Sequence, residues 1–493
     1  MVPIIITVVY FLFFCIFFGL RSRKNVADGK QFFTAGGLMG WVAVMCSFSL
    51  APLGGGHTSS LWEQAGGVGV GAAWWGIAFG GTMVPIFMLW FGPMFLKLKV
   101  QTFPQGMGKI FGPKMKVWNS AVAPAGWLGI GMAEIFGTAM AVYTLSGAAN
   151  GPLSVTACVL IAGLLNLIYI FFAGMLQASY MNIINAIVLI VGSFVAIFWL
   201  GGSIPGGYQA IADSYAAQGM ASKTNLFSLT PDVLWGVLIP VVILGIFSVS
   251  SEQKQYLPML SARDDNAIRK GAVPGGIINA ISCIPFVILG VVAGSGHLAN
   301  VGSSGAIRAV PELVAGYLPP VMVGILMVSL LCALLSTGSG VILSTSHVIY
   351  DDFIKPVSKK EHTPKQQKII SRIVCVVIAL MAAIPSLFVE VFMNLFFFCF
   401  SLSLPIFICY LIGMLWKINR KAAWINCIAS LAVNCWWTFA LPSWCPSQFA
   451  LSFYPVFVVT IVLGLVLNLV LPGEKGMLKQ ISEQEKAQKA VKA

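Results

Sequence analysis

The residues best suited to bind a ligand lie in the segment 49–63, where Pro52 and three consecutive glycines at 54–56 interrupt a long apolar stretch. Proline destabilises a helix interior by about 3 kcal/mol relative to alanine, and glycine by about 1 kcal/mol. Inside a membrane, irregular backbone persists only where protein or a water-filled cavity satisfies its polar groups. We therefore expect a helix broken at the membrane midplane, with its carbonyls and amides directed toward a ligand. The alternative is a kinked helix that packs through small residues.

A second polar group lies in another apolar segment. Ser336 and Thr337 follow Ala333 by about one helical turn. Their hydroxyls, together with a helix carbonyl, make a patch of the hard oxygen ligands that sodium prefers. The broken helix would supply the remaining carbonyls. The alternative is that both hydroxyls bond back to carbonyls one turn earlier, as is common in membrane helices.

Ionisable residues within apolar segments form a third group, because a charge at membrane depth is costly and suggests function. Glu134 lies deepest, and Glu63 follows the glycines. Glu252 and Glu390 lie at the ends of spans, where we expect them to be interfacial. His57, beside the glycines, is a candidate ligand contact or proton carrier, with a packed histidine bonded to backbone as the alternative.

Tryptophans near these groups could bind a cation through their ring faces. Trp62 and Trp127 are candidates for this role, although most tryptophans in membrane proteins pack or anchor at the interface. We expect no lysine or arginine deep in a span, and hence no obvious carboxylate clamp.

The eleven cysteines form no CxxC pair and no cluster with histidine, so we expect no cofactor and no disulfide framework; Cys435 and Cys445 are the one pair that could join. Without a nucleophile and base in one span, we expect no enzyme.

Membrane-spanning helices must position these groups. Of the 493 residues, 58% are hydrophobic and 9% are charged, which is typical of an all-α polytopic membrane protein. Because a span needs about 20 apolar residues, we expect thirteen, at 3–20, 38–66, 70–95, 117–145, 153–172, 182–200, 233–251, 272–293, 320–349, 370–389, 391–416, 423–440 and 453–471.

Basic residues set the expected orientation, because they are enriched in cytoplasmic loops. With the N-terminus outside, all of the 29 lysines and arginines except Lys223 and Arg308 fall on the inner side, Lys254 among them. The net charge of +13 is therefore a topology signal and not a nucleic-acid-binding surface. We expect a multi-pass protein of the plasma membrane with a cytoplasmic C-terminus, and the short tail favours a prokaryotic inner membrane. The oligomeric state is left open.

A second interrupted span, at 245–253, follows the first by about 195 residues. An even number of intervening spans, with a reversal of direction, would give the two halves inverted topology. Two interrupted helices at corresponding places are the best sequence indication of a transporter's central site.

These features together resemble the sodium/solute symporter family, whose members include sodium/glucose, proline, sialic acid and choline transporters. The similarity extends from Ala27 to about Cys427. The segments that carry it, in order, are DGKQFFTAGG at 28–37, LGGGH at 53–57 followed by Glu63, LST at 335–337 with ILS at 342–344, and Pro405 with GMLWK at 413–417 and Asn419.

The resemblance implies a leucine-transporter-like fold with five plus five inverted helices. It implies an extra helix at 3–20, repeats at 38–200 and 233–416, two further helices at 423–471 and a cytoplasmic tail at 473–493. It also implies a sodium site formed by Leu50, Leu53, Ala333, Ser336 and Thr337. In the family, the position matching His57 and the region of Gln253 face the substrate. Our substrate-binding candidates are Gly55, Gly56, His57, Trp62, Glu63, Trp127, Glu134 and Gln253.

Three positions depart from the family pattern. Asn182 and Asn185 stand where many members have an aspartate and a glutamine, and Ser339 stands where many have an aspartate. A second sodium site is therefore not expected, and we expect one sodium per cycle or some proton coupling through His57 or Glu134.

The resulting prediction is a sodium-coupled symporter that imports a small organic solute by alternating access through the lipid bilayer. A proton-driven transporter of the same fold and a non-transporting solute receptor are the alternatives. Buried acids and tryptophans favour a cationic or zwitterionic solute, although helix-end amides can bind a carboxylate without arginine.

Overall fold

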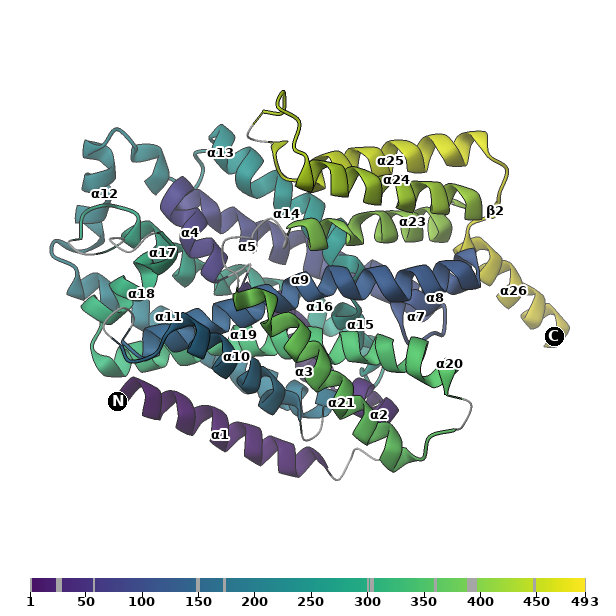
Figure 1. Cartoon of the computed structure of the whole chain (residues 1–493), viewed down its shortest axis with the longest axis horizontal. Coiled ribbons are helices and arrows are strands. Elements are labelled where there is room, and N and C mark those ends of the chain that lie inside the picture. The colour runs from purple at the N-terminus through teal and green to yellow at the C-terminus, as the bar shows by residue number, and fades with distance from the viewer. Residues whose placement is uncertain are drawn as a thin grey trace.

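The computed structural model describes residues 2–23, 29–55, 58–147, 151–171, 174–298, 301, 306–358, 361–387, 397–446 and 449–492. Within these ranges the chain is a bundle of helices that run roughly side by side (Figure 1). Two short strands, β1 (Lys417–Ile418) and β2 (Glu474–Lys475), pair antiparallel and connect the end of the bundle to its C-terminal segment.

Over its described residues, each expected span coincides with a helix or a run of short helices; residues 388–396, at the junction of two expected spans, lie outside the described ranges. These helices are α1 (Val2–Arg23), α3 (Trp41–Leu50) with α4 (Ser59–Val68), the segment from η3 (Gly69–Ala73) to α7 (Gly92–Leu96), α9 (Pro113–Leu145), α10 (Val155–Ile170), α11 (Gly174–Ser203), the segment from α13 (Pro231–Val233) to η10 (Val249–Ser251), α16 (Asp265–Ser282) with α17 (Ile284–Ala293), α19 (Pro320–Val348), α21 (Pro364–Ala383), α23 (Ser403–Leu415), α24 (Arg420–Phe439) and α25 (Phe453–Val470). By length and composition alone, ten helical stretches within the described ranges are apolar enough to cross a membrane.

Both predicted interruptions are present. The helix α3 ends at Leu50 and α4 begins at Ser59, with the residues Ala51 to Gly55 buried between them. In the second case, η9 (Leu244–Ser248) and η10 lead to Glu252, whose backbone is extended, and α15 (Gln253–Leu260) follows. Pro52 has no N–H to donate to a helical hydrogen bond, and the glycines and serines at these places disfavour a continuous helix.

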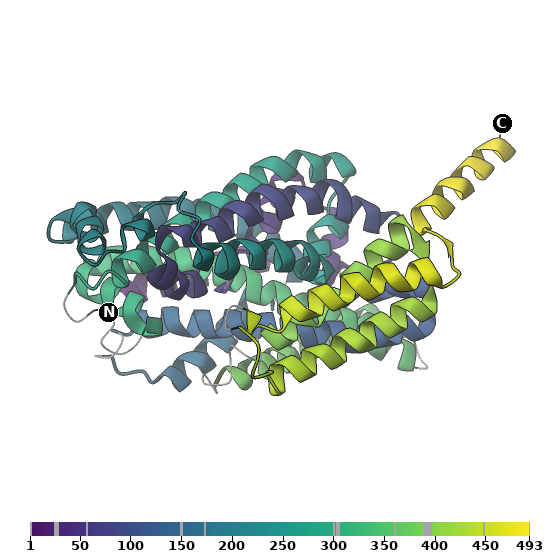
Figure 2. The ribbon, with the colours of Figure 1, turned by 90° about the horizontal axis from the view of Figure 1, so that it is seen from above.

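The helix α19 lies at the centre of the bundle and packs against α1, α9, α10 and α11. Its side chains are buried almost without exception from Val323 to Val348, so any partner of its many hydroxyls lies inside the protein, and a hydroxyl there without a partner is exceptional. The helices α23, α24 and α25 form a separate group along one side, and α26 (Met477–Lys492) projects away from the bundle (Figure 2). Division of the chain into repeats at 38–200 and 233–416 stays a prediction.

Candidate functional site

The first break is held by a carboxylate from the neighbouring helix. Glu134, in the buried middle of α9, accepts a hydrogen bond at Oε2 from the Gly55 backbone N–H, at 2.8 Å. A Cβ at position 54 would lie 1.8 Å from Glu134 Oε1, so only glycine lets the carboxylate lie against this backbone. Thr58 closes the other side, since its hydroxyl donates to the Gly54 carbonyl at 3.0 Å. Gly54 therefore leaves room for the Glu134 side chain.

The second break holds a buried ion pair. The Lys254 ammonium lies 3.1 Å from Glu252 Oε2, and both side chains are almost completely buried. Glu252 Oε1 has no hydrogen-bond partner in the part of the chain that the structure describes. We expected Glu252 to be interfacial, Lys254 to lie in an inner loop and no lysine to lie deep in a span; the structure instead buries both side chains as a pair inside the protein. The extended backbone at Glu252 turns the chain inward, and each charge makes the burial of the other tolerable.

A cavity of about 250 Å³ lies between the two breaks. Its polar wall includes Glu134, Glu252 and Lys254, and Glu63 of α4 lies at its exposed rim. The remaining lining is mainly apolar and aromatic, with Pro52, Ser60, Gln64, Trp75, Phe79, Ile130, Ala133, Leu244, Gly245, Val249, Phe397 and Phe400. The two predicted candidates Glu63 and Glu134 thus share one cavity with an ion pair that sequence reasoning missed.

The candidate sodium ligands lie where α3 meets α19. The Thr337 hydroxyl donates to the Leu50 carbonyl at 2.9 Å, and the Leu53 N–H donates to the same carbonyl at 3.0 Å. Ala333 is fully buried, one turn before Thr337. The buried Ser336 hydroxyl has no hydrogen-bond partner among the described residues. This set consists of neutral, hard oxygen ligands, which fits an alkali cation better than a softer metal.

The other substrate-binding candidates do not line this cavity or lie outside the described residues. Both ends of the Gln253 amide bond to backbone. Its Oε1 accepts from the Phe103 N–H at 2.8 Å, and its Nε2 donates to the Gln101 carbonyl at 2.9 Å. Trp62 and Trp127 are buried, and their indole N–H groups have no acceptor within the described ranges. Gly56, His57 and Glu390 lie outside the described residues. Their substrate roles stay predictions.

The departures at positions 182 and 185 belong to a neutral hydrogen-bond network. Tyr10 donates to Asn185 Oδ1 at 2.9 Å, and Asn185 donates to the Tyr169 hydroxyl at 2.7 Å. Tyr169 donates to Asn182 Oδ1 at 2.9 Å, and Asn182 donates to the Ser47 hydroxyl at 3.2 Å. The network joins α1, α3, α10 and α11 without a carboxylate. Sequence reasoning missed Tyr10 and Tyr169 because their spacing along the chain has no pattern.

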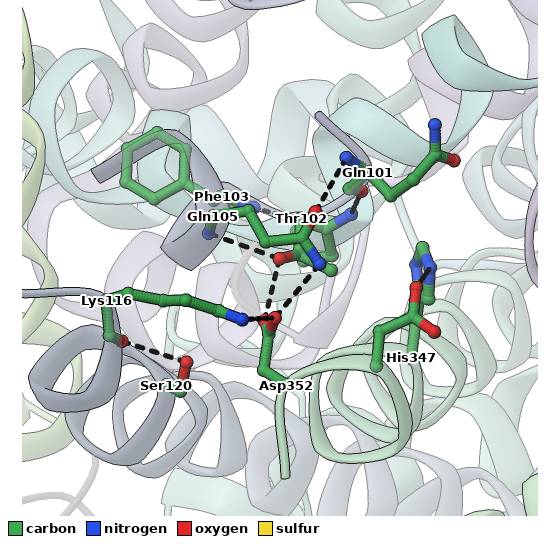
Figure 3. Close-up of polar contacts among 10 residues, drawn as sticks. Gln101, Thr102, Phe103, Gln105, Lys116, Ser120, His347 and Asp352 are labelled. Carbon is green, nitrogen blue, oxygen red and sulfur yellow. Dashed lines mark hydrogen bonds and ion pairs between the residues drawn. The ribbon is translucent and has the colours of Figure 1, made fainter. Parts of the chain in front are cut away.

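A buried carboxylate, that of Asp352, joins several elements at the end of the molecule away from α4 (Figure 3). Asp352, in η11 (Ile349–Ile354) after α19, accepts from the Thr102 hydroxyl at 2.7 Å and the Gln105 amide at 2.9 Å. The Lys116 ammonium lies 3.1 Å from the same carboxylate. These partners come from the start of α8 (Phe103–Phe111) and from α9, and the Gln253 amide bonds to the same loop. The cluster joins four elements on the side of the breaks away from α4.

Comparison with known proteins gives relatives along most of the chain. A model of the sodium:solute symporter family matches residues 32–429. Sodium/myo-inositol cotransporter 2 of Rattus norvegicus is 21% identical over 87% of this chain and 69% of its own length. Sodium/glucose cotransporter 4 of Danio rerio is 22% identical over 87% of this chain and 70% of its own length.

Solved structures share the fold. A substrate-bound, outward-open structure of a Na+-coupled sialic acid symporter covers 96% of this chain and 99% of its own, with a TM-score of 0.79 and 15% identity. A mutant of the Eremococcus coleocola manganese transporter covers 86% of this chain and 92% of its own, with a TM-score of 0.51 and 15% identity. The expected leucine-transporter-like fold is confirmed. The broken helices, the central cavity and these matches lead to one conclusion: the chain belongs to the sodium:solute symporter family and is a multi-pass membrane transporter, not an enzyme.

Proposed function

We propose that the protein imports a small organic solute by coupling its movement to one sodium ion. The observation that carries this proposal is the contact between the Thr337 hydroxyl and the Leu50 carbonyl, 2.9 Å apart. It places a hydroxyl of the central helix α19 against the carbonyl end of the broken helix. The Ser336 hydroxyl beside it, which has no hydrogen-bond partner among the residues that the structure describes, supplies a further buried oxygen.

Sodium binds between α3 and α19, held by the carbonyls of Leu50 and Leu53 together with Ala333, Ser336 and Thr337. Binding there joins the broken helix to α19 and so stabilises one arrangement of the two. The solute then binds in the cavity next to Glu134, and the helices rock to expose both to the other side. A membrane potential contributes about 2.3 kcal/mol per charge per 100 mV to the inward movement of sodium.

The cavity faces outward in this conformation if the N-terminus lies outside, as the basic residues indicate. Glu63, exposed at the cavity rim, belongs to the half-helix on the outer side of the first break. The Asp352 cluster lies toward the other side, where it closes the path below the breaks. Inward opening requires those contacts to separate.

A proton-coupled transporter is the second candidate, because a buried carboxylate, Glu134, contacts the first break directly. A group in this place could carry a proton and release the Gly55 N–H as it does so. Solute uptake that rises at acid pH and needs no sodium would favour this mechanism.

The first test is the melting temperature of the purified protein in sodium and in potassium at equal ionic strength. We expect a sodium-specific rise in the parent that Ser336→Ala and Thr337→Ala both abolish. Ser344→Ala is the matched control, since this buried serine on α19 bonds to the Val341 carbonyl one turn earlier. Its sodium response should equal that of the parent. No sodium effect in the parent at saturating salt would overturn the proposal and favour proton coupling.

A further inference from the structure

In the described part of the chain, two groups at the cavity could attract an anion, and each already contacts an internal carboxylate. Backbone amides at a helix break bind anionic substrate groups in transporters of this architecture. Here the Gly55 amide donates to Glu134 Oε2 at 2.8 Å. The other anion-binding group is the Lys254 ammonium, which lies 3.1 Å from Glu252 Oε2. A carboxylate on the solute would have to displace Glu134 from the Gly55 N–H or share the Lys254 ammonium with Glu252.

The remaining charge of the cavity favours a cation. Its lining contains the carboxyl groups of Glu63, Glu134 and Glu252 but the single ammonium of Lys254. Glu252 is 1% exposed, and its Oε1 has no hydrogen-bond partner in the described ranges. A buried carboxylate oxygen without a donor is costly, and a donor from a bound solute would remove that cost.

The apolar part of the cavity suits the body of such a solute. Trp75, Phe79, Phe397 and Phe400 line it, and ring faces attract ammonium groups as well as alkyl groups. The volume of about 250 Å³ is smaller than that of drug-binding pockets, which are about 300–1,000 Å³, so the solute is compact.

We propose that the solute is a small organic cation, a protonated amine or quaternary ammonium compound without a required carboxylate. Its charge binds between Glu134 and Glu252, and its alkyl part lies against the aromatic wall. This inference rests on the proposed function, because it names the solute class of the same cavity.

The test uses matched probes with the full-length protein in sodium buffer. Alkylammonium and tetraalkylammonium ions of up to about six carbons are compared with the alcohol, carboxylate and amino acid of the same skeleton. We expect the ammonium ions to raise the melting temperature and their alcohol and carboxylate counterparts to leave it unchanged. The inference is overturned if no ammonium ion stabilises the protein, or if carboxylates, alcohols or only the amino acids do so.

Two variants then give effects of opposite sign. Glu134→Gln keeps an acceptor for the Gly55 N–H and removes the charge, so ammonium binding should weaken about tenfold or more. Lys254→Gln keeps a donor for Glu252 and frees its charge, so ammonium binding should tighten or stay the same. Loss of ammonium binding in Lys254→Gln, or unchanged binding in Glu134→Gln, overturns the inference. Glu483→Gln, an exposed tail residue, is the control and should match the parent.

The sodium response separates this inference from the proposed function. If sodium stabilises the protein through Ser336 and Thr337 but ammonium ions have no effect, the proposed solute class is wrong and the proposed sodium coupling stands. If ammonium ions bind equally well in sodium and in potassium and sodium has no effect of its own, the proposed solute class stands and the proposed sodium coupling is wrong.

Discussion

The hydroxyl of Thr337 lies 2.9 Å from the carbonyl oxygen of Leu50 and donates a hydrogen bond to it. This bond crosses from the buried central helix α19 to the carbonyl end of a helix that is broken in mid-span. A cation that binds both oxygens therefore reports directly on the relative position of the two helices. In the proposed mechanism, this contact is the place where ion binding is coupled to conformation.

Removal of this hydroxyl should weaken sodium binding with little loss of stability. In Thr337→Val the shape of the side chain is kept, and the Leu50 carbonyl still accepts from Leu53 N–H, so folding should lose about 1 kcal/mol. The sodium concentration for half-maximal stabilisation or uptake should rise about tenfold or more. Thr337→Ser, which retains the hydroxyl, should stay near the parent. Equal sodium dependence in the valine and serine variants would contradict a ligand role for Thr337.

Gly54→Ala should disturb the first break through Glu134. The added Cβ would lie 1.8 Å from Glu134 Oε1, and the carboxylate is buried and bonded to the adjacent Gly55 N–H. We expect a destabilisation of about 1–3 kcal/mol, as for other overpacked sites, together with weaker solute binding. Gly67→Ala in α4 is the control, because nothing lies within 4 Å of its Cβ. The melting temperatures of both variants test this prediction, and similar values would contradict the close approach of Glu134 to Gly54.

Asp352→Ala should loosen the end of the molecule away from α4. It leaves the Thr102 hydroxyl and the Gln105 amide without their acceptor, at a cost of about 1–3 kcal/mol per buried group. Backbone amides of α8 and of η11 should then exchange hydrogen faster, while those of α24 and α25 should not change. Glu483→Ala breaks an exposed ion pair in the tail and should have no such effect. Unchanged exchange in α8 would show that Asp352 does not hold this closure.

Sodium activation of transport should be non-cooperative. Asn182 and Asn185 contribute amides to the network with Tyr10 and Tyr169, and that network contains no carboxylate to attract a second cation. We therefore expect a Hill coefficient for sodium of about 1. Asn182→Ala should lower thermal stability but leave the shape of the activation curve unchanged. A coefficient close to two in the parent would contradict coupling to a single sodium ion.

Local chemistry determined much of the fold. The apolar runs predicted thirteen spans, and ten helical stretches in the described ranges are long and apolar enough to cross a membrane. The interruptions near Gly54 and Glu252 were also predictable, since glycine, proline and clustered serines disfavour a continuous helix wherever they stand. Residue type together with the family resemblance predicts Thr337 and Leu50 as ion ligands, and the structure brings these two residues together.

Tertiary structure decided which charges meet. By sequence, Lys254 belonged to a cytoplasmic loop and Glu252 to an interface, yet both are buried as a pair on the cavity wall. Gln253, between them, points the other way and bonds to the 101–103 backbone. In the same way, Asp352 meets Lys116 and Glu134 meets Gly55 across long stretches of chain. A titratable side chain carries no local signal of its partner, because the energy of burying it depends on groups that only the packed helices bring within a few ångströms.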